Sequence, residues 1–267
     1  MKILLIDVGN SNIVIGLFED GTKLFQDRTE TGRNWDSLCF MNELETIFFS
    51  HSISGNAVDG AIISSVVPDL NPILSTAIRH FTGHNPMIAD RSHIDIPVRD
   101  YDIDRLGMDR MVDMIAAREK YGAPLIIYDL GTCTTMSTLD AEGYFNGGMI
   151  SPGVQLGLDA EAQKTAQLPE LMADSPKALL GNDTVSCMIN GSVIGTAAMI
   201  DGIHERVAEE MNLDVEKLPL VLTGGLGRLV LPWMKHPACF EPDLLLNGLE
   251  ILYRKNVPMT SSEAVLQ

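Results

Sequence analysis

The sequence has 267 residues, a formal net charge of −17 and a hydrophobic content of 45%. The negative charge repels phosphate backbones, so the composition argues against a nucleic-acid-binding protein. The hydrophobic content favours a globular chain with a sizeable core over a disordered chain. A small nucleotide remains compatible with this charge, because backbone N–H groups and a cation can hold its phosphates.

The cysteines and the apolar segments give a first indication of the compartment. Cys39, Cys133, Cys187 and Cys239 are far apart and form no CxxC pair. This pattern disfavours a zinc site or a disulfide framework and is typical of a reducing compartment. The sequence shows no basic segment followed by an apolar core at its start, and no apolar run of about 18 residues. We therefore expect a cytoplasmic protein that does not span a membrane.

The first part of the chain predicts a mixture of strands and helices. β-Branched and leucine-rich runs predict strands at 2–7, 13–18 and 22–29, with a hairpin turn at Glu19-Asp20-Gly21. Helical periodicity follows, with Asn34 as a candidate N-cap. The elements expected up to Gly122 are a helix at 34–50, a strand at 60–68, a helix at 70–82, a short strand at 86–89, a loop at 90–104 and a helix at 105–122.

The pattern then restarts. Residues 4–21 (LLIDVGNSNIVIGLFEDG) align without a gap with residues 126–143 (IIYDLGTCTTMSTLDAEG), at a constant offset of 122 residues. Asp7 aligns with Asp129 in this comparison. The elements expected after the second copy are helices near 154–166 and 184–212, a strand at 218–225 and a helix at 242–256. We predict a duplicated α/β unit; a chance match between two short hairpins is the alternative.

Each copy places an aspartate at the end of a strand, followed by a glycine and small polar residues. A carboxylate in this position can hold a hydrated cation. Glycine lets a ligand approach the backbone, and the N–H groups of the turn suit phosphate oxygens. Two such turns, with a third glycine turn at 222–227, predict a clamp for a triphosphate and its metal. Taken alone, the third turn is equally well explained as an ordinary strand-to-helix turn.

The segment GMDR (107–110) has a chemical and a structural interpretation. Asp109 lies in the first turns of a helix expected to begin near Asp104, where the helix dipole stabilises a carboxylate. It could accept the proton of an alcohol during phosphoryl transfer, and Arg110 could bind a substrate carboxylate through two hydrogen bonds. The alternative is an exposed ion pair of Asp109 or Asp113 with Arg110 or another arginine, which is a common and weak interaction.

Five segments together resemble the type III pantothenate kinase family, within the superfamily of actin, hexokinase and the Hsp70 ATPase domain. They are DVGNSN (7–12), GMDR (107–110), DLGTCTT (129–135), GGMISPG (147–153) and TGG (223–225), in the family's order and spacing. The resemblance runs from Met1 to about residue 256. Ser11 stands where the family commonly has threonine and Cys133 where it has alanine. The first change keeps the hydroxyl group and the second keeps a small side chain.

The resemblance implies an α/β fold of duplicated ribonuclease H-like (actin-like ATPase) domains. Each domain would have a mixed five-stranded sheet with flanking helices, and a cleft would lie between the domains. The expected boundaries are 1–118 for the N-terminal domain, 119–256 for the C-terminal domain and 257–267 for a flexible tail.

The resemblance also implies the reaction and the residues that perform it. The chain would use ATP, Mg²⁺ and a monovalent cation (K⁺ or NH₄⁺) to phosphorylate pantothenate to 4′-phosphopantothenate, the first step of coenzyme A biosynthesis. Asp109 would be the general base, Asp129 would hold the monovalent cation, and Asp7 would lie nearer Mg²⁺. The expected ATP-binding residues are Asp7, Val8, Gly9, Asn10, Ser11, Asn12, Ile13, Val14, Thr132, Gly224 and Gly225, and the expected pantothenate-binding residues are Tyr101, Gly107, Met108, Asp109, Arg110 and Thr184.

Several alternatives stay open. Thr184 could instead, or in addition, be the N-cap of the long helix. The small residues Gly191 and Gly195 on that helix indicate close packing or, by resemblance, part of a homodimer interface. Other functions are a kinase for another small alcohol or sugar, and a non-catalytic regulator of the Bvg accessory factor type. A regulator would be expected to lack the base or the phosphate turn, whose residues are present here. An actin-like filament is disfavoured because the chain has no large insertions.

Overall fold

The computed structural model describes residues 1–32 and 34–257, and the chain divides into two compact units. Unit 1 contains Met1–Asp95, Asp104–Ala116 and the described residues from Leu244 to Val257. Unit 2 contains Ile96–Ile103 and Ala117–Asp243. Of the predicted flexible tail, residues 258–267 lie outside the described part of the chain.

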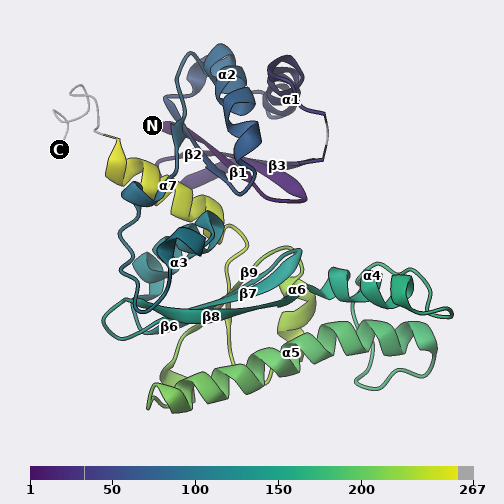
Figure 1. Cartoon of the computed structure of the whole chain (residues 1–267). Coiled ribbons are helices and arrows are strands. Elements are labelled where there is room, and N and C mark those ends of the chain that lie inside the picture. Colours follow the sequence, from purple (N-terminus) through teal and green to yellow (C-terminus); the bar gives the residue numbers. More distant parts are fainter. Residues whose placement is uncertain (33, 258–267) are drawn as a thin grey trace. The chain divides into compact units, whose positions relative to one another are not determined.

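Unit 1 is a mixed five-stranded sheet with helices on both faces (Figure 1). Alternate residues of the first strand, such as Ile6, face the core formed with Phe40 and Phe48 of the first helix. Asp7 therefore faces the opposite side of the sheet. The strands, in the order β3-β2-β1-β4-β5, are β1 (Lys2–Val8), β2 (Asn12–Glu19), β3 (Thr22–Glu30), β4 (Gly60–Ser65) and β5 (Met87–Ile88); the helices are α1 (Ser37–Ser50), α2 (Asn71–Thr82), the first turns of α3 (Met108–Tyr121) and α7 (Leu244–Asn256).

Unit 2 repeats this sheet. Its strand order, β10-β9-β6-β7-β8, has the same parallel and antiparallel pairings as unit 1, with β6 in the place of β1 and β9 in the place of β4. This repetition confirms the predicted duplicated α/β fold. The elements are β6 (Leu125–Leu130), β7 (Cys133–Leu139), β8 (Phe145–Pro152), β9 (Leu220–Thr223), β10 (Cys239–Phe240), α4 (Val154–Lys164), α5 (Thr184–Glu210) and α6 (Gly227–Val230).

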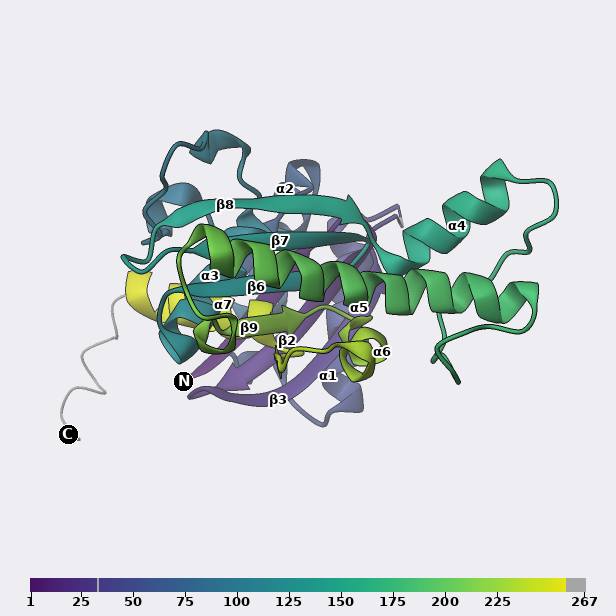
Figure 2. The same ribbon diagram turned by 90° about the horizontal axis from the view of Figure 1, so that it is seen from below.

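Helix α5 covers one face of the second sheet and has 27 residues, whereas β8, a long strand of that sheet, has 8. Its residues Val193, Ala197 and Ile200 join Tyr128 of β6 in the buried core of unit 2. Figure 2 shows its N-terminal part continuing past the ends of the strands, beside α4. By length and composition alone α5 could cross a membrane, although the sequence predicted no such segment. This is weak evidence, because core helices of soluble proteins meet the same criterion.

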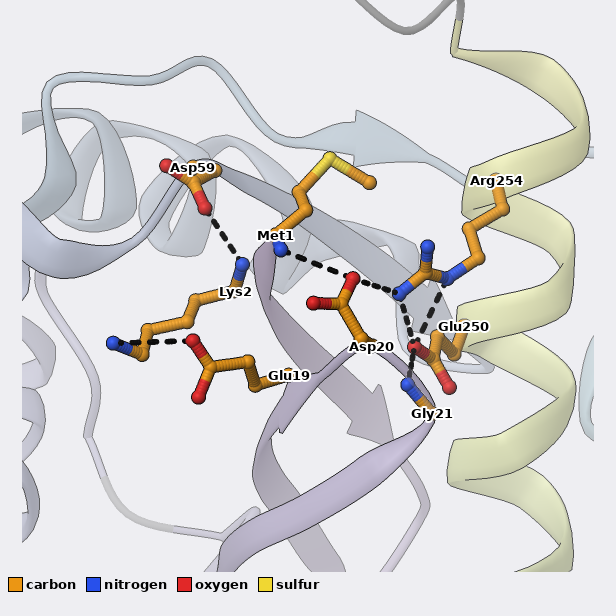
Figure 3. Close-up of polar contacts among 8 residues, drawn as sticks. All are labelled: Met1, Lys2, Glu19, Asp20, Gly21, Asp59, Glu250 and Arg254. Carbon is orange, nitrogen blue, oxygen red and sulfur yellow. Dashed lines mark hydrogen bonds and ion pairs between the residues drawn. The ribbon is translucent and has the colours of Figure 1, made fainter. Parts of the chain in front are cut away.

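Helix α7 packs in unit 1, whereas the sequence assigned it to the second domain. It lies on the face of β1 and β4 opposite α1 and α2, where a Cβ at Gly60 would come within 1.8 Å of the Tyr253 hydroxyl oxygen. The buried carboxylate of Glu250 accepts hydrogen bonds from the backbone of Gly21 (2.8 Å) and from Arg254 (2.9 and 3.0 Å) (Figure 3). These contacts hold the last helix against the first hairpin.

Asp20 in the same hairpin joins both ends of the described chain. Its carboxylate contacts the amino group of Met1 at 3.1 Å and the guanidinium of Arg254 at 3.3 Å. The hydrogen bond from the N-terminal ammonium, followed by that from Arg254, lowers the pKa of Asp20. The N-terminal strand and the C-terminal helix are therefore parts of one folding unit.

Three predicted boundaries of helices and strands were wrong. Helix α1 begins at Ser37, and Asp36 rather than Asn34 is its N-cap, accepting a hydrogen bond from the backbone of Cys39 at 2.7 Å. Helix α3 begins at Met108 and not near Asp104, because Ile103–Arg105 form a separate 3₁₀ turn. Strand β4 ends at Ser65, before the proline that closes the predicted strand.

The gap-free alignment of the two copies is wrong after the first glycine. Val8 pairs with Ile13 in unit 1, whereas Leu130 pairs with Thr134 in unit 2. The turn between β6 and β7 is therefore one residue shorter than the turn between β1 and β2. The structure makes Thr132 the counterpart of Ser11, not of Asn10. A longer connection between β7 and β8 than between β2 and β3 restores the offset at Gly143.

Candidate active site

The first aspartate–glycine turn is fixed by a hydrogen bond within it and by hydrogen bonds from Thr31, the residue that follows β3. Gly9 N donates to Asn12 O at 3.0 Å, and the Thr31 hydroxyl donates to Gly9 O at 2.7 Å. Asp7, at the end of β1, is only 8% exposed, whereas Asn10–Asn12 are exposed. The predicted ATP-binding residues 7–14 thus comprise the ends of two strands and a turn held by hydrogen bonds. The carboxylate of Asp7 is buried, and the polar residues at the tip of the turn are exposed.

Two glycines from other parts of unit 2 pack closely against the second aspartate–glycine turn, which follows β6. Gly153 N donates to Thr132 O at 3.2 Å, and a Cβ at Gly153 would lie 2.4 Å from that oxygen. Gly224 has a left-handed backbone (φ +88°), and a Cβ there would lie 2.4 Å from Oδ1 of Asp129. The structure therefore places Gly224 against Asp129 and Gly153 against Thr132, whereas the predicted ATP-binding residue Gly225 is exposed.

Asp109 lies in the first turn of α3, close over Gly107. A Cβ at Gly107 would come within 2.4 Å of Asp109 Oδ1, so this glycine leaves room for the carboxylate. The same oxygen accepts a hydrogen bond from the backbone of Arg110 at 2.8 Å. Asp109 is half-buried, and Arg110 and Asp113 are buried. The alternative of an exposed ion pair is therefore wrong for Arg110 and Asp113.

The remaining predicted substrate residues lie in different environments. Met108 is the first residue of α3, beside Asp109. Tyr101 is partly exposed and packs edge-on against Phe145, with ring centroids 5.2 Å apart. Thr184 is exposed at the N-terminal end of α5, in the part that extends past the strands (Figure 2). It is not the N-cap, because Asp183 accepts the capping hydrogen bond from Ser186 N at 2.7 Å.

The predicted site residues are thus divided between the two units. Unit 1 holds Asp7–Val14 and Gly107–Arg110; unit 2 holds Tyr101, Asp129, Thr132, Thr184, Gly224 and Gly225. Sequence reasoning did not assign Gly153, although it lies in one of the recognised segments and follows a strand just before a helix. It also missed Thr31, for which the sequence contains no signal, because its contact with Gly9 spans 22 residues.

The described residues contain no group of three or more histidine, cysteine, aspartate or glutamate side chains that could enclose a metal. The four cysteines are free and exposed. A magnesium ion with a triphosphate needs only one or two protein carboxylates, because phosphate oxygens and water complete its coordination. The single buried carboxylate of Asp7 beside a phosphate-type turn fits that requirement.

Comparisons with known proteins agree with these features. Residues 3–206 match the family described as type III pantothenate kinase. A type III pantothenate kinase from Exiguobacterium sibiricum is 34% identical over 255 residues, which cover 95% of this chain and 99% of that protein. Another, from Streptomyces avermitilis, is 33% identical over 266 residues, which cover 97% and 100% of the two chains.

Solved structures share the fold at low sequence identity. A protein from Campylobacter jejuni assigned to the Baf family of transcriptional activators has a TM-score of 0.57 and 16% identity, covering 95% of this chain and 98% of that one. A protein from Sinorhizobium meliloti assigned as a 2-dehydro-3-deoxygalactonokinase has a TM-score of 0.54 and 16% identity, covering 97% and 98%. At these identities the likeness shows the fold alone.

Proposed function

The chain belongs to the type III pantothenate kinase family, and we propose that it performs the family's reaction with Asp109 as general base and with ATP held by the two aspartate–glycine turns. The reaction is the ATP-dependent phosphorylation of pantothenate in coenzyme A biosynthesis. The observation that carries the proposal is the recurrence of this turn at the ends of β1 and β6, which occupy equivalent places in two equivalent sheets.

The proposed chemistry is direct transfer between two bound substrates. Asp109 takes the proton of the primary alcohol while the alcohol oxygen attacks the γ-phosphorus of ATP, and the bond to the leaving ADP breaks. Arg110 binds the carboxylate of pantothenate and orients the alcohol. Bound Mg²⁺ supplies neutralisation of charge on the triphosphate. The N–H groups of Gly9 and Gly131 close the turns themselves, and the remaining backbone N–H groups of the two turns bind phosphate oxygens. No covalent enzyme intermediate is needed.

The Asp129 carboxylate is proposed to hold a monovalent cation. Gly224 packs directly against this carboxylate, which limits where it can move. We expect turnover to fall by about tenfold or more when K⁺ is replaced by Na⁺ at constant Mg²⁺, because a charge-stabilising contact near the triphosphate is lost. A coupled assay of ADP release measures this, with choline chloride to keep the ionic strength constant. Equal rates in K⁺ and Na⁺ would contradict the role of Asp129.

The same assay separates the proposed substrate from the alternatives. Release of ADP with pantothenate, and not with a panel of sugars, supports the pantothenate assignment over a sugar kinase. Release with neither class of substrate would favour a non-catalytic regulator. The net charge of −17 supports a protein that does not act on nucleic acid, and the free cysteines support the proposed cytoplasmic location.

We propose further that the chain forms a homodimer through an apolar surface around the projecting end of α5. We call this the arm surface, and its exposed residues are Leu156, Met172, Leu179, Leu180 and Val185. Clusters of exposed large apolar side chains are typical of protein–protein interfaces. A second copy is the proposed occupant, because the resemblance to the family implies a homodimer formed through the corresponding helices. Thr184, next to Val185, would then lie at the interface.

Replacing Leu180 by aspartate is expected to give a monomer, because the charge would have to be buried at the interface. Leu180 is 83% exposed in one chain, so the change leaves the fold intact. Light scattering after size exclusion should give the 29.1 kDa of one chain instead of twice that mass. Phe49→Asp is the matched control, since Phe49 is 85% exposed on α1 in unit 1, whereas the arm surface belongs to unit 2. A dimeric Leu180→Asp variant would contradict the assignment.

A further inference from the structure

Ser64, the penultimate residue of β4, lies directly beside Asp7 in the first sheet. The parallel pairing of β1 with β4 places Ser64 in register with Asp7. Side chains of paired residues leave a sheet on the same face. The preceding residues Ile6 and Ile63 both face the core with α1 and α2, so Asp7 and Ser64 share the opposite face.

The hydroxyl of Ser64 has no hydrogen-bond partner among the described residues. Its side chain is fully buried, at 0% exposure. The next residue shows the usual arrangement, because the Ser65 hydroxyl accepts a hydrogen bond from Val67 N at 3.0 Å. A buried hydroxyl without a partner destabilises a folded protein, and such exceptions in native structures call for an explanation. A partner that arrives with the ligand explains this one.

Unit 2 repeats the arrangement. There the parallel pairing of β6 with β9 places Thr223 in register with Asp129. Thr223 is also buried, and it is again a hydroxyl residue at the end of the strand beside the aspartate. In both strands the residues before this hydroxyl are aliphatic, but none is identical at the equivalent positions. Both copies therefore place a hydroxyl next to the carboxylate.

We propose that Ser64 is a positioning residue for the magnesium–triphosphate complex, whose hydroxyl accepts a hydrogen bond from a water molecule of hydrated Mg²⁺ next to Asp7. This inference rests on the proposed assignment of Asp7 to Mg²⁺. Water bound to Mg²⁺ is a strong donor, and hydrated Mg²⁺ is commonly held through few protein ligands and several waters. The buried hydroxyl would orient one of these waters and so fix the cation against the carboxylate.

The substitution Ser64→Ala separates this role from a structural one. Because the orphan hydroxyl makes no contact to lose, the ligand-free variant should melt at the same temperature as the unchanged protein, or higher. The Mg²⁺ concentration for half-maximal activity should rise by about tenfold, within the range known for residues that support a metal ligand. In thermal-shift measurements, a non-hydrolysable ATP analogue with Mg²⁺ should stabilise the variant less than it stabilises the unchanged protein.

Thr29→Val is the matched control. Thr29 is a second buried hydroxyl without a partner among the described residues, but it pairs with Ile13, which faces the core with α1 and α2. This variant should keep the normal Mg²⁺ dependence. An unchanged Mg²⁺ dependence and thermal shift in Ser64→Ala would overturn the inference, and so would equal losses in both variants. Asp7→Asn tests the premise separately: if it keeps the full Mg²⁺-dependent shift, the assignment of Asp7 fails.

Discussion

Replacing Asp109 by asparagine is expected to lower turnover with pantothenate by about 10²- to 10⁴-fold, the usual contribution of a general base. Asparagine has nearly the same size, and its amide oxygen can still accept the hydrogen bond from Arg110 N that Asp109 Oδ1 accepts at 2.8 Å. It also fits over Gly107, where the carboxylate oxygen now lies. The change therefore removes the proton acceptor and preserves the start of α3.

Steady-state rates measure the loss of turnover, and calorimetry with a non-hydrolysable ATP analogue and Mg²⁺ measures whether the nucleotide still binds. We expect binding to be retained, because Asp109 is assigned to the alcohol and not to the triphosphate. Asp69→Asn is the control, since Asp69 is an exposed acidic residue in the short helical turn before α2. Full turnover by Asp109→Asn would exclude Asp109 as the base.

Local signals in the sequence were sufficient to predict the first two strands of each sheet, whereas β8 and β10 were not predicted. The runs around Asp7 and Asp129 have the composition of strands, and each is followed by a glycine turn and a second strand. The position of α7 could not be predicted in this way. Helix α7 is anchored by the contact between Glu250 and Gly21, which are 229 residues apart. Neither segment contains a sequence pattern that indicates this contact. The domain boundary drawn at residue 118 missed this return of the chain.

The predictions of helix N-caps failed for a different reason, because neighbouring residues can serve equally well as the cap. Asn34 and Asp36 are both good N-caps, as are Asp183 and Thr184, and only the geometry of the first turn selects between them. The one-residue difference between the two phosphate-type turns was hidden because a later turn compensates for it. A constant offset in the sequence therefore did not mean a constant register in the sheets.

A role for Asp109 could be proposed from the sequence, because the motif GMDR carries its own chemistry. The pairing of Ser64 with Asp7 was not predictable, because a serine at the end of a strand is common and its neighbour is set by the order of strands. The same holds for Gly153, whose close approach to Thr132 depends on where β8 ends. Contacts between strands must be known before such residues can be assigned.

Replacing Gly224 by alanine is expected to damage both the stability of unit 2 and the proposed cation site. Its left-handed backbone (φ +88°) costs about 1–2 kcal/mol for a residue with a side chain. The new methyl group would also lie 2.4 Å from Asp129 Oδ1 and 2.5 Å from Leu130 N. Overpacking of this kind typically costs a further 1–3 kcal/mol or so, and relieving it requires the carboxylate to move.

Gly83→Ala separates the two effects. Gly83 has a similar backbone (φ +81°) at the C-terminal end of α2, with no atom within 4 Å of the added Cβ, so that variant bears the backbone strain alone. Thermal denaturation should show a larger loss of stability for Gly224→Ala than for Gly83→Ala. In the K⁺ titration, only Gly224→Ala should need more K⁺ or lose its response, since displacement of Asp129 by about 1 Å can cost about 10² in rate. If the two variants have the same K⁺ response, the close packing of Gly224 on Asp129 does not position the carboxylate for a cation.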